Sequence, residues 1–183
     1  YFCPQTIIDI PREDECFERV TKTLDKNGIK WSLHGQCDIT FHQWGLLKFF
    51  KECGTSASTK KIPEWIFELD SSYQKRVLDG CRDSDGDNRG VISTCSKGLQ
   101  EDLARLHINC GIMPTLLERP ARTAHLKDGR IIKGNFPEYR VYPLKDKTGY
   151  QRGNHKTVPY KGKVWCLEVE DNHNFVVERN GKL

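Results

Sequence analysis

The sequence predicts a mixed α+β fold made of two related units followed by a β-rich segment. Short runs rich in β-branched and aromatic residues alternate with longer runs whose apolar residues recur every three or four positions. Glycines follow those longer runs where helices are expected to end. The pattern of the first unit returns 83 residues later, which indicates an internal duplication. The matched positions are Cys16, Val20, Thr23, Gly28 and Ile29 with Leu99, Leu103, Leu106, Gly111 and Ile112.

The first unit is predicted to contain a strand, a helix, a hairpin and a second helix. Residues 6–10 are rich in β-branched side chains and end at a proline, as short strands do. A helical pattern follows from residue 12 and stops at Gly28. Residues 29–41 alternate apolar and polar side chains around a His-Gly turn, which predicts a hairpin with one apolar face. Residues 43–53 predict the closing helix.

The second unit is predicted to start with a helix at Ser71 that stops at Gly86. The Ser71 hydroxyl is expected to cap this helix, with Gln74 as its capping-box partner. Residues 91–94 predict a strand and residues 98–110 a helix. Further strands are predicted over four later segments, residues 130–132, 139–142, 163–169 and 174–177.

Composition excludes several classes of protein. The chain has 183 residues, of which 37% are apolar and 30% charged, as in a globular domain. No run approaches the ~20 apolar residues of a membrane span, and the N-terminus lacks the pattern of a signal peptide. No two of the eight cysteines lie within three residues of each other, which argues against a zinc ribbon or a redox pair. We therefore expect mostly buried cysteines in a reducing, cytoplasmic protein.

The net charge of +4 is unevenly distributed. Residues 119–163 alone carry a net charge of +9, whereas the segments before and after them are slightly acidic. Such a local excess is typical of a segment that faces a polyanion, although an ordinary solvated loop region is the alternative.

Two carboxylates, Asp83 and Asp85, fall in the last turn of the helix predicted from Ser71. The helix dipole disfavours anions at that end by a few tenths to ~1 kcal/mol each, so a compensating cation is expected. Carboxylate oxygens with few other ligands suit Mg²⁺, which keeps much of its water and contacts phosphates. A solvated acidic turn without a metal is the alternative.

Residues 78–86, which read Leu-Asp-Gly-Cys-Arg-Asp-Ser-Asp-Gly, resemble the signature peptide of the LAGLIDADG homing endonucleases. The preceding Lys-Lys-Ile-Pro at residues 60–63 resembles the segment that precedes the second signature in members carried by inteins. The resemblance covers about residues 6–118. It implies a duplicated αββαββα domain with a truncated first repeat, because the helix that precedes the first strand would fall at or before residue 1.

The resemblance also implies site residues and partners. Asp85 would bind the catalytic Mg²⁺, with Asp83 in support, and Lys60 would act beside the scissile phosphate. The partner would be double-stranded DNA, held by the two sheets and by cations of the basic segment. The candidate DNA-binding residues are Arg119, Arg122, Lys127, Arg130, Lys133 and Arg140.

Residues 164–169 and 172–176 resemble the penultimate motif of inteins, a hairpin of the β-rich Hint splicing domain. The resemblance places Cys166 where a catalytic aspartate or cysteine lies, and His173 where a histidine assists acyl transfer and asparagine cyclisation. Neither the N-terminal splicing motifs nor the terminal His-Asn is seen. We therefore expect an N-terminal intein fragment, or a missing N-terminal segment, as a second partner.

The sequence-based interpretation is thus the C-terminal portion of an intein with an embedded DNA endonuclease. Its predicted parts are an endonuclease-like domain (1–118), a basic connector (119–163) and a splicing hairpin (164–183). Whether it is an active enzyme stays open at this stage. The alternatives are a degenerate domain that only binds DNA or scaffolds a split intein, and a freestanding homing endonuclease.

Overall fold

The computed structural model describes residues 5–125, 128–144, 157–165, 168–169 and 177. In chain order the elements are β1 (Thr6–Asp9), α1 (Glu15–Lys26), β2 (Trp31–His34), β3 (Asp38–Phe41), α2 (Trp44–Glu52), a 3₁₀ helix η1 (Glu64–Glu68), α3 (Ser71–Asp85), β4 (Ile92–Thr94), α4 (Lys97–Asn109), β5 (Pro114–Arg119), β6 (Thr123–His125), β7 (Ile131–Lys133) and β8 (Glu138–Pro143). The mixed α+β class predicted from the sequence is confirmed.

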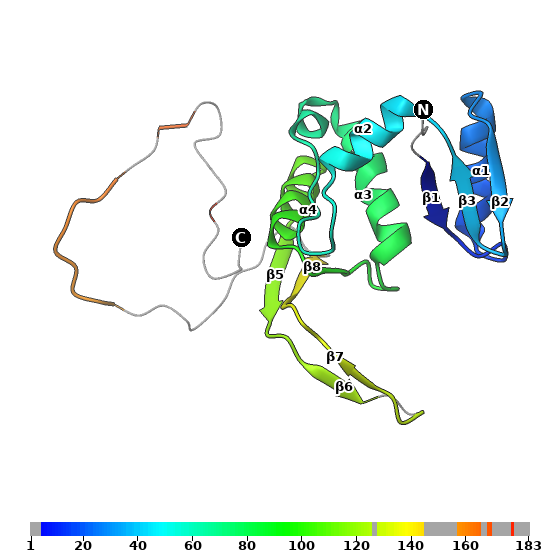
Figure 1. Ribbon diagram of the computed structural model, residues 1–183. Coiled ribbons are helices and arrows are strands. Elements are labelled where there is room, and N and C mark those ends of the chain that lie inside the picture. The colour runs from blue at the N-terminus through cyan, green and yellow to red at the C-terminus, as the bar shows by residue number, and fades with distance from the viewer. Residues whose placement is uncertain (1–4, 126–127, 145–156, 166–167, 170–176, 178–183) are drawn as a thin grey trace.

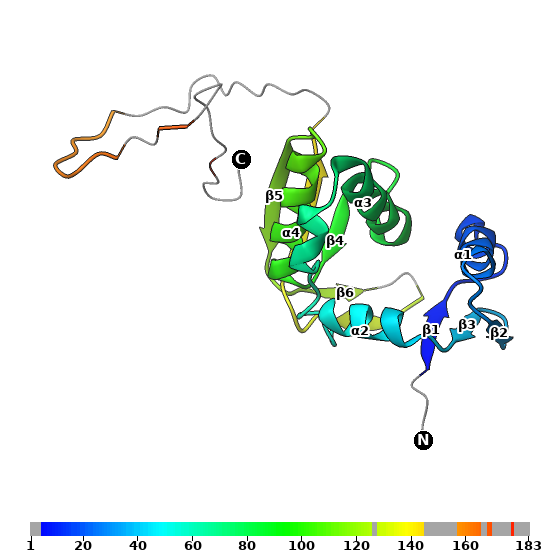
Figure 2. The ribbon, with the colours of Figure 1, turned by 90° about the horizontal axis from the view of Figure 1, so that it is seen from above.

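Two three-stranded antiparallel sheets share one topology. In the first sheet the order is β1–β3–β2, and in the second it is β4–β8–β5, so the last strand of each unit lies in the middle. In both units a helix joins the first strand to the next, α1 in one and α4 in the other (Figure 1 and Figure 2). The order of elements therefore repeats along the chain, as the 83-residue spacing of the sequence indicates.

Both of these helices end in the same way. Gly28 and Gly111 follow α1 and α4 with positive φ angles of 66° and 73°. The backbone N–H of Ile29 donates to the carbonyl of Leu24 at 2.9 Å, and that of Ile112 donates to His107 at 2.8 Å. In each case the N–H of a residue bonds to the carbonyl five residues before it, which satisfies a free carbonyl at the helix end. This arrangement needs a left-handed residue, and glycine adopts that conformation without strain.

The start of α3 differs from the prediction. The helix is capped by Asp70, whose carboxylate accepts a hydrogen bond from the Ser72 backbone N–H at 2.8 Å, and not by Ser71. Gln74 is buried, and its amide donates to the carbonyls of Phe67 and Leu69. An aspartate is as good an N-cap as a serine, and the buried amide of Gln74 is engaged by the preceding 3₁₀ turn instead.

Each sheet has its own hydrophobic core. Around the second sheet, Leu78 of α3 packs with Leu103 and Leu106 of α4 and with Val141 of β8, all of them fully buried. Around the first sheet the fully enclosed residues are fewer, and most of the apolar side chains next to them stay partly exposed. The second unit therefore holds the more complete core, and it is the rigid support for the surface described below.

Part of the predicted basic connector belongs to this second sheet. Strand β8 pairs with β4 and with β5 on either side, and β5 itself extends to Arg119. The unit therefore continues past residue 118, because the strand that completes its sheet comes only after the β6–β7 ribbon. The ribbon is a two-stranded antiparallel pair that projects away from the body of the molecule (Figure 1).

Candidate nucleic-acid interface

The acidic end of α3 is engaged in ion pairs with neighbouring segments. Asp83 pairs with Arg19 of α1, with 2.6 Å between the carboxylate oxygen and the guanidinium nitrogen. Asp85 lies 3.9 Å from the Lys60 ammonium. The structure thus places Lys60 near Asp85, whereas Asp83 pairs with Arg19.

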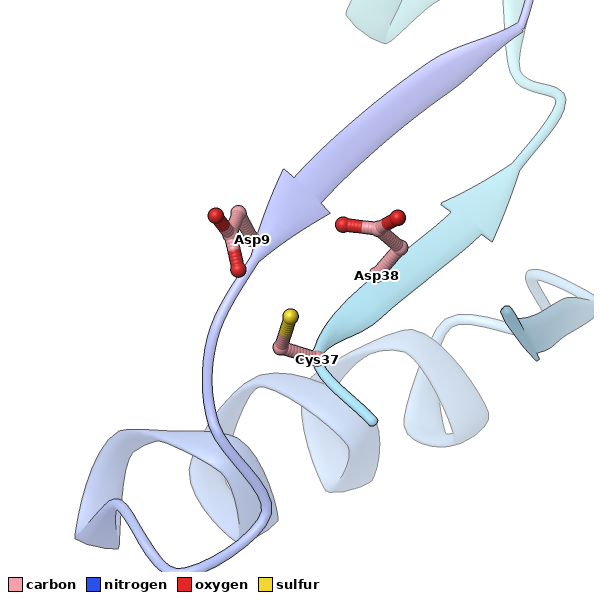
Figure 3. Close-up of side chains that lie close together, drawn as sticks. All are labelled: Asp9, Cys37 and Asp38. Atoms are coloured by element: carbon pink, nitrogen blue, oxygen red, sulfur yellow. The ribbon is translucent and has the colours of Figure 1, made fainter. Parts of the chain in front are cut away.

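This end of the helix does not assemble a set of metal ligands. Within the part of the chain that the structure describes, three or more potential ligands meet only at Asp9, Cys37 and Asp38, where β1 ends and β3 begins (Figure 3). Neither Asp83 nor Asp85 belongs to that group. Their negative charges are balanced by arginine and lysine side chains instead.

The Asp9–Cys37–Asp38 group is a poor site for a soft metal. Asp9 and Asp38 face each other across the β1–β3 pair, and Cys37 precedes β3 (Figure 3). A hydrogen bond to Asp9, together with burial, raises the pKa of the Cys37 thiol to about 11. The thiol is therefore protonated at neutral pH, so a metal ion or an electrophile would have to displace that proton.

Neutralising Asp85 is expected to change stability little. The pair with Lys60 is long and both side chains are about half exposed, and such exposed pairs contribute 0–1 kcal/mol. We predict that Asp85→Asn alters the free energy of unfolding by less than about 0.5 kcal/mol in urea titrations. A loss above about 2 kcal/mol would show that Asp85 has a structural role that this pair does not explain.

Basic side chains gather on one side of the second sheet. Val141 of β8 is buried against α4, so its neighbours along the strand point to the opposite side. On that side Arg119 of β5 stands directly opposite Glu138 of β8. Arg122, just before β6, brings its guanidinium to 4.0 Å from the same carboxylate. We call this surface, made by Arg119, Arg122, Glu138, Arg140 and Tyr142, the arginine face.

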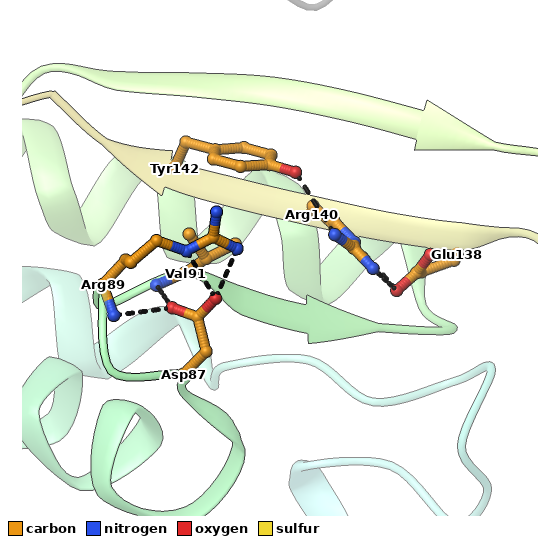
Figure 4. A network of polar contacts seen from close by, with 6 residues as sticks. All are labelled: Asp87, Arg89, Val91, Glu138, Arg140 and Tyr142. Carbon is orange, nitrogen blue, oxygen red and sulfur yellow. Dashed lines mark hydrogen bonds and ion pairs between the residues drawn. The ribbon is translucent and has the colours of Figure 1, made fainter.

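Within the arginine face, Arg140 is held from two sides. Its Nε and Nη2 donate to one oxygen of Glu138 at 2.8 and 2.6 Å, and its Nη1 lies 3.4 Å from the Tyr142 hydroxyl (Figure 4). The hydrogen bond to Glu138 raises the pKa of the guanidinium. The side chain is only 19% exposed. Arg140 is therefore a permanent cation in a fixed orientation.

The same local pairing occurs twice more. Arg89 donates to the carboxylate of Asp87, and Arg130 donates to that of Asp128, with the acid two residues before the arginine each time (Figure 4 shows the first). Both arginines are largely exposed, at 67% and 75%. The acid–x–arginine spacing is visible in the sequence, but on its own it does not indicate that the two side chains bond.

The β6–β7 ribbon extends the basic surface. Lys133 of β7 and Arg130 next to it are exposed, and Arg122 precedes β6. Five of the six predicted DNA-binding residues thus lie along the arginine face and the ribbon. The sixth, Lys127, lies outside the described residues, as do Cys166 and His173. Of the strand predicted over 163–169, the described positions 163–165 and 168–169 are not in a strand.

Glu138 and Asp87 are site residues that were not predicted from the sequence. Each orients an arginine. For Glu138, the alternation of a strand, which places residues 138, 140 and 142 on one side, could have indicated this role from the sequence.

None of the helices in the described ranges has the length and apolar character that a bilayer crossing needs.

Comparison with known proteins gives one relative of stated function. No family model matches the sequence. The chain is similar to an iron-sulfur cluster assembly SufBD family protein of Mycobacterium leprae, with 32% identity over 112 residues. The matched region is 57% of this chain and 13% of the relative, so the chain spans a small part of that protein's length.

This similarity corrects the function expected from the sequence. The relative is named for iron-sulfur cluster assembly, which points away from protein splicing and from DNA cleavage. On this finding the prediction of an intein fragment with an embedded endonuclease is wrong, and so are its alternatives of a freestanding and a degenerate endonuclease. The predicted Mg²⁺ cofactor is contradicted with them, and Asp85 and Lys60 are left as an exposed ion pair. The similarity does not test the predicted double-stranded DNA partner.

Proposed function

We propose that this chain binds double-stranded DNA through the arginine face and the β6–β7 ribbon. The observation that carries the proposal is that Glu138 pairs with both Arg122 and Arg140, while Arg119 lies opposite Glu138 on β5, at the base of a projecting basic ribbon. These three arginines and one glutamate leave an excess of positive charge on the surface of a well-packed sheet. Such a surface attracts the phosphate backbone of nucleic acids.

The shape of this region supports double-stranded nucleic acid over a small anion. A two-stranded antiparallel ribbon fits into the major groove of B-DNA, which is about 12 Å wide. Arg130 and Lys133 lie at its exposed surface, within reach of the phosphates that line such a groove. The β6–β7 ribbon connects β5 to β8 of the sheet. With the ribbon in the groove, the arginine face of this sheet would therefore lie close to the base edges.

Salt dependence of binding tests the proposal. The full chain is titrated against a fluorescein-labelled duplex of mixed sequence, and anisotropy is recorded between 50 and 300 mM salt. With three or four cations on phosphates, the logarithm of the association constant is expected to fall with a slope of about −2.7 to −3.6 against the logarithm of the salt concentration. Binding that is absent, or independent of salt, would overturn the proposal.

Two variants and a control locate the contact. Arg122→Ala and Lys133→Ala are each expected to reduce the magnitude of the salt slope by about one, because each removes one phosphate contact. Lys22→Ala is the matched control, since Lys22 is an exposed lysine on α1 that pairs with Glu18 away from this surface. An equal change in the control would mean that net charge, and not this surface, governs binding.

We further propose that the repeated units form a duplicated fold of the LAGLIDADG type, with a Hint-like segment after it. The shared strand order and the shared glycine caps of the two units support the duplicated part. This proposal concerns the architecture alone. It does not include DNA cleavage or splicing, which the similarity to an iron-sulfur cluster assembly protein contradicts.

Cluster assembly, the function in the relative's name, finds little support in the geometry. Iron-sulfur clusters are held mainly by several cysteine thiolates. In the described ranges, the only group of three potential ligands contains a single cysteine, Cys37, with a raised pKa. Cys53 and Cys81 lie near enough to interact, but no third potential ligand joins them among the described residues. These residues do not fit an iron-sulfur cluster.

A further inference from the structure

The geometry points to Arg140 as a residue that reads guanine in the major groove, with Glu138 as its positioning residue. This inference rests on the proposed DNA binding and deepens it. It separates the cations of the region into those that contact phosphates in any sequence and one that selects a base.

The fixed orientation of the side chain is the first step. Phosphate contacts tolerate a flexible cation, whereas reading a base edge needs a guanidinium held at one angle. Glu138 accepts hydrogen bonds from Nε and Nη2 of Arg140, and the Tyr142 hydroxyl accepts one from Nη1. The three side chains come from alternate positions of one strand, so β8 itself sets their spacing.

The backbone beneath Arg140 is equally fixed. Strand β8 is the central strand of its sheet, with Ser93 of β4 and Leu117 of β5 directly opposite Arg140 on its two sides. From α4, the buried amide of Gln100 donates to the Arg140 carbonyl at 2.9 Å. The next residue, Val141, is fully buried in the core. The Cα of Arg140 therefore has little freedom.

The remaining donors of Arg140 match guanine. Besides the bonds to Glu138 and Tyr142, Nη1 and Nη2 each keep one N–H that donates to none of the described residues. Two parallel N–H donors complement the O6 and N7 acceptors of guanine in the major groove. Adenine presents a donor in place of O6, so the same fork is repelled by it. The held guanidinium is thus selective for one base.

The other arginines of the region differ from Arg140 in exposure. Arg89 and Arg130 also bond to carboxylates, but their side chains are 67% and 75% exposed and they follow turns, not strand centres. Arg140 is 19% exposed and lies on the sheet. We therefore assign phosphate contact to the exposed pair and base selection to Arg140.

Selection from a randomised duplex library tests this assignment. The full chain is incubated with a library of duplexes, and bound molecules are sequenced after several rounds. The wild type is expected to enrich a motif with one nearly invariant guanine, with discrimination of about 5- to 100-fold against other bases at that position. Arg140→Lys keeps the positive charge but lacks the two parallel N–H donors of the guanidinium. This variant is expected to lose the base preference at that position only.

Variants of Glu138 and Tyr142, which contact Arg140, distinguish a positioning role of these residues from a role in folding. Glu138→Gln is expected to weaken the preference for the same guanine while leaving overall affinity within about tenfold, and its thermal unfolding is measured in parallel. Tyr142→Phe removes the weaker contact and is expected to have a smaller effect of the same kind. Lys22→Ala, on α1 and outside the arginine face and the ribbon, is the control, and it should leave the motif unchanged.

The outcomes distinguish this inference from the proposed function. If the wild-type chain binds the mixed duplex with the expected salt slope but Arg140→Lys retains the full guanine preference, Arg140 is not the reading residue and the inference is overturned. A wild-type motif without any invariant guanine overturns it as well. If the chain binds no duplex at all, the proposed function fails and the inference fails with it.

Discussion

Replacing Leu78 by alanine is expected to lower the free energy of unfolding by about 2–5 kcal/mol. Leu78 is fully buried in the middle of α3 and packs with Leu103, Leu106 and Val141 from α4 and β8. Truncation removes apolar contact and leaves a cavity that this well-packed cluster fills poorly. Since domains of this size are stable by only about 5–15 kcal/mol, the loss is a large fraction of the total.

Urea unfolding followed by tryptophan fluorescence measures the effect, with the midpoint and slope fitted separately. Tyr73→Ala is the matched control, because Tyr73 lies on the same helix but is 55% exposed, and a change below about 1 kcal/mol is expected. If Leu78→Ala proves no worse than Tyr73→Ala, α3 does not pack on the second sheet as described.

The packing of this core also positions the side chains of the arginine face. Val141 lies in the cluster, and its two neighbours on β8 are Arg140 and Tyr142. The alternation of the strand turns the one residue inward and the other two outward. Loosening the core would therefore disturb the guanidinium that we assign to base reading. For this reason DNA binding by core variants is a poor test of the surface, and surface substitutions are needed.

The sequence predicted those features that depend on neighbours along the chain. The helix ends at Gly28 and Gly111 follow from a local need for left-handed backbone, which glycine meets at little cost. The helices themselves follow from apolar periodicity over one or two turns. The capping error at Ser71 has the same local scale: the adjacent aspartate is an equally good cap, and periodicity alone does not choose between them.

Features that join distant segments were harder to predict. Nothing in the residues of β8 shows that it returns past the β6–β7 ribbon to pair with β4 and β5, and this pairing brings Arg140 and Arg119 to one face. Strand pairing depends on contacts between separate segments, which a single sequence does not reveal. The resemblance assigned Lys60 and Asp85 to one site, although it did not predict their ion pair. The Arg19–Asp83 pair depends on how α1 lies against α3, and it was not predicted.

Stability is expected to fall as the pH decreases from about 7.5 to 5 because of His107. This side chain of α4 is fully buried, its Nδ1 bonds to the Leu103 carbonyl at 2.7 Å, and no described group pairs with its Nε2. Burial lowers the pKa of the imidazole, and nearby Arg82 acts in the same direction. The folded state therefore favours the neutral ring.

The sign of the effect follows from proton binding. Above the unfolded-state pKa of about 6.5, neither state is protonated and the contribution of His107 is complete. Below it the unfolded chain takes up a proton that the folded chain resists, so stability is lost as pH falls toward the lowered folded-state value. The acidic groups with lowered pKa values, Asp70, Asp87 and Asp128 among them, titrate at lower pH and do not obscure this window.

His107→Leu isolates the effect, because leucine is the residue that the first unit carries at the matching position, Leu24. The variant removes both the titration and the unpaired buried nitrogen, so its midpoint of thermal unfolding should change less than the wild type's between pH 7.5 and 5. At pH 5 it should be the more stable protein. An identical pH profile in both proteins would mean that another group accounts for the acid sensitivity, and that the interior around His107 admits the charged ring.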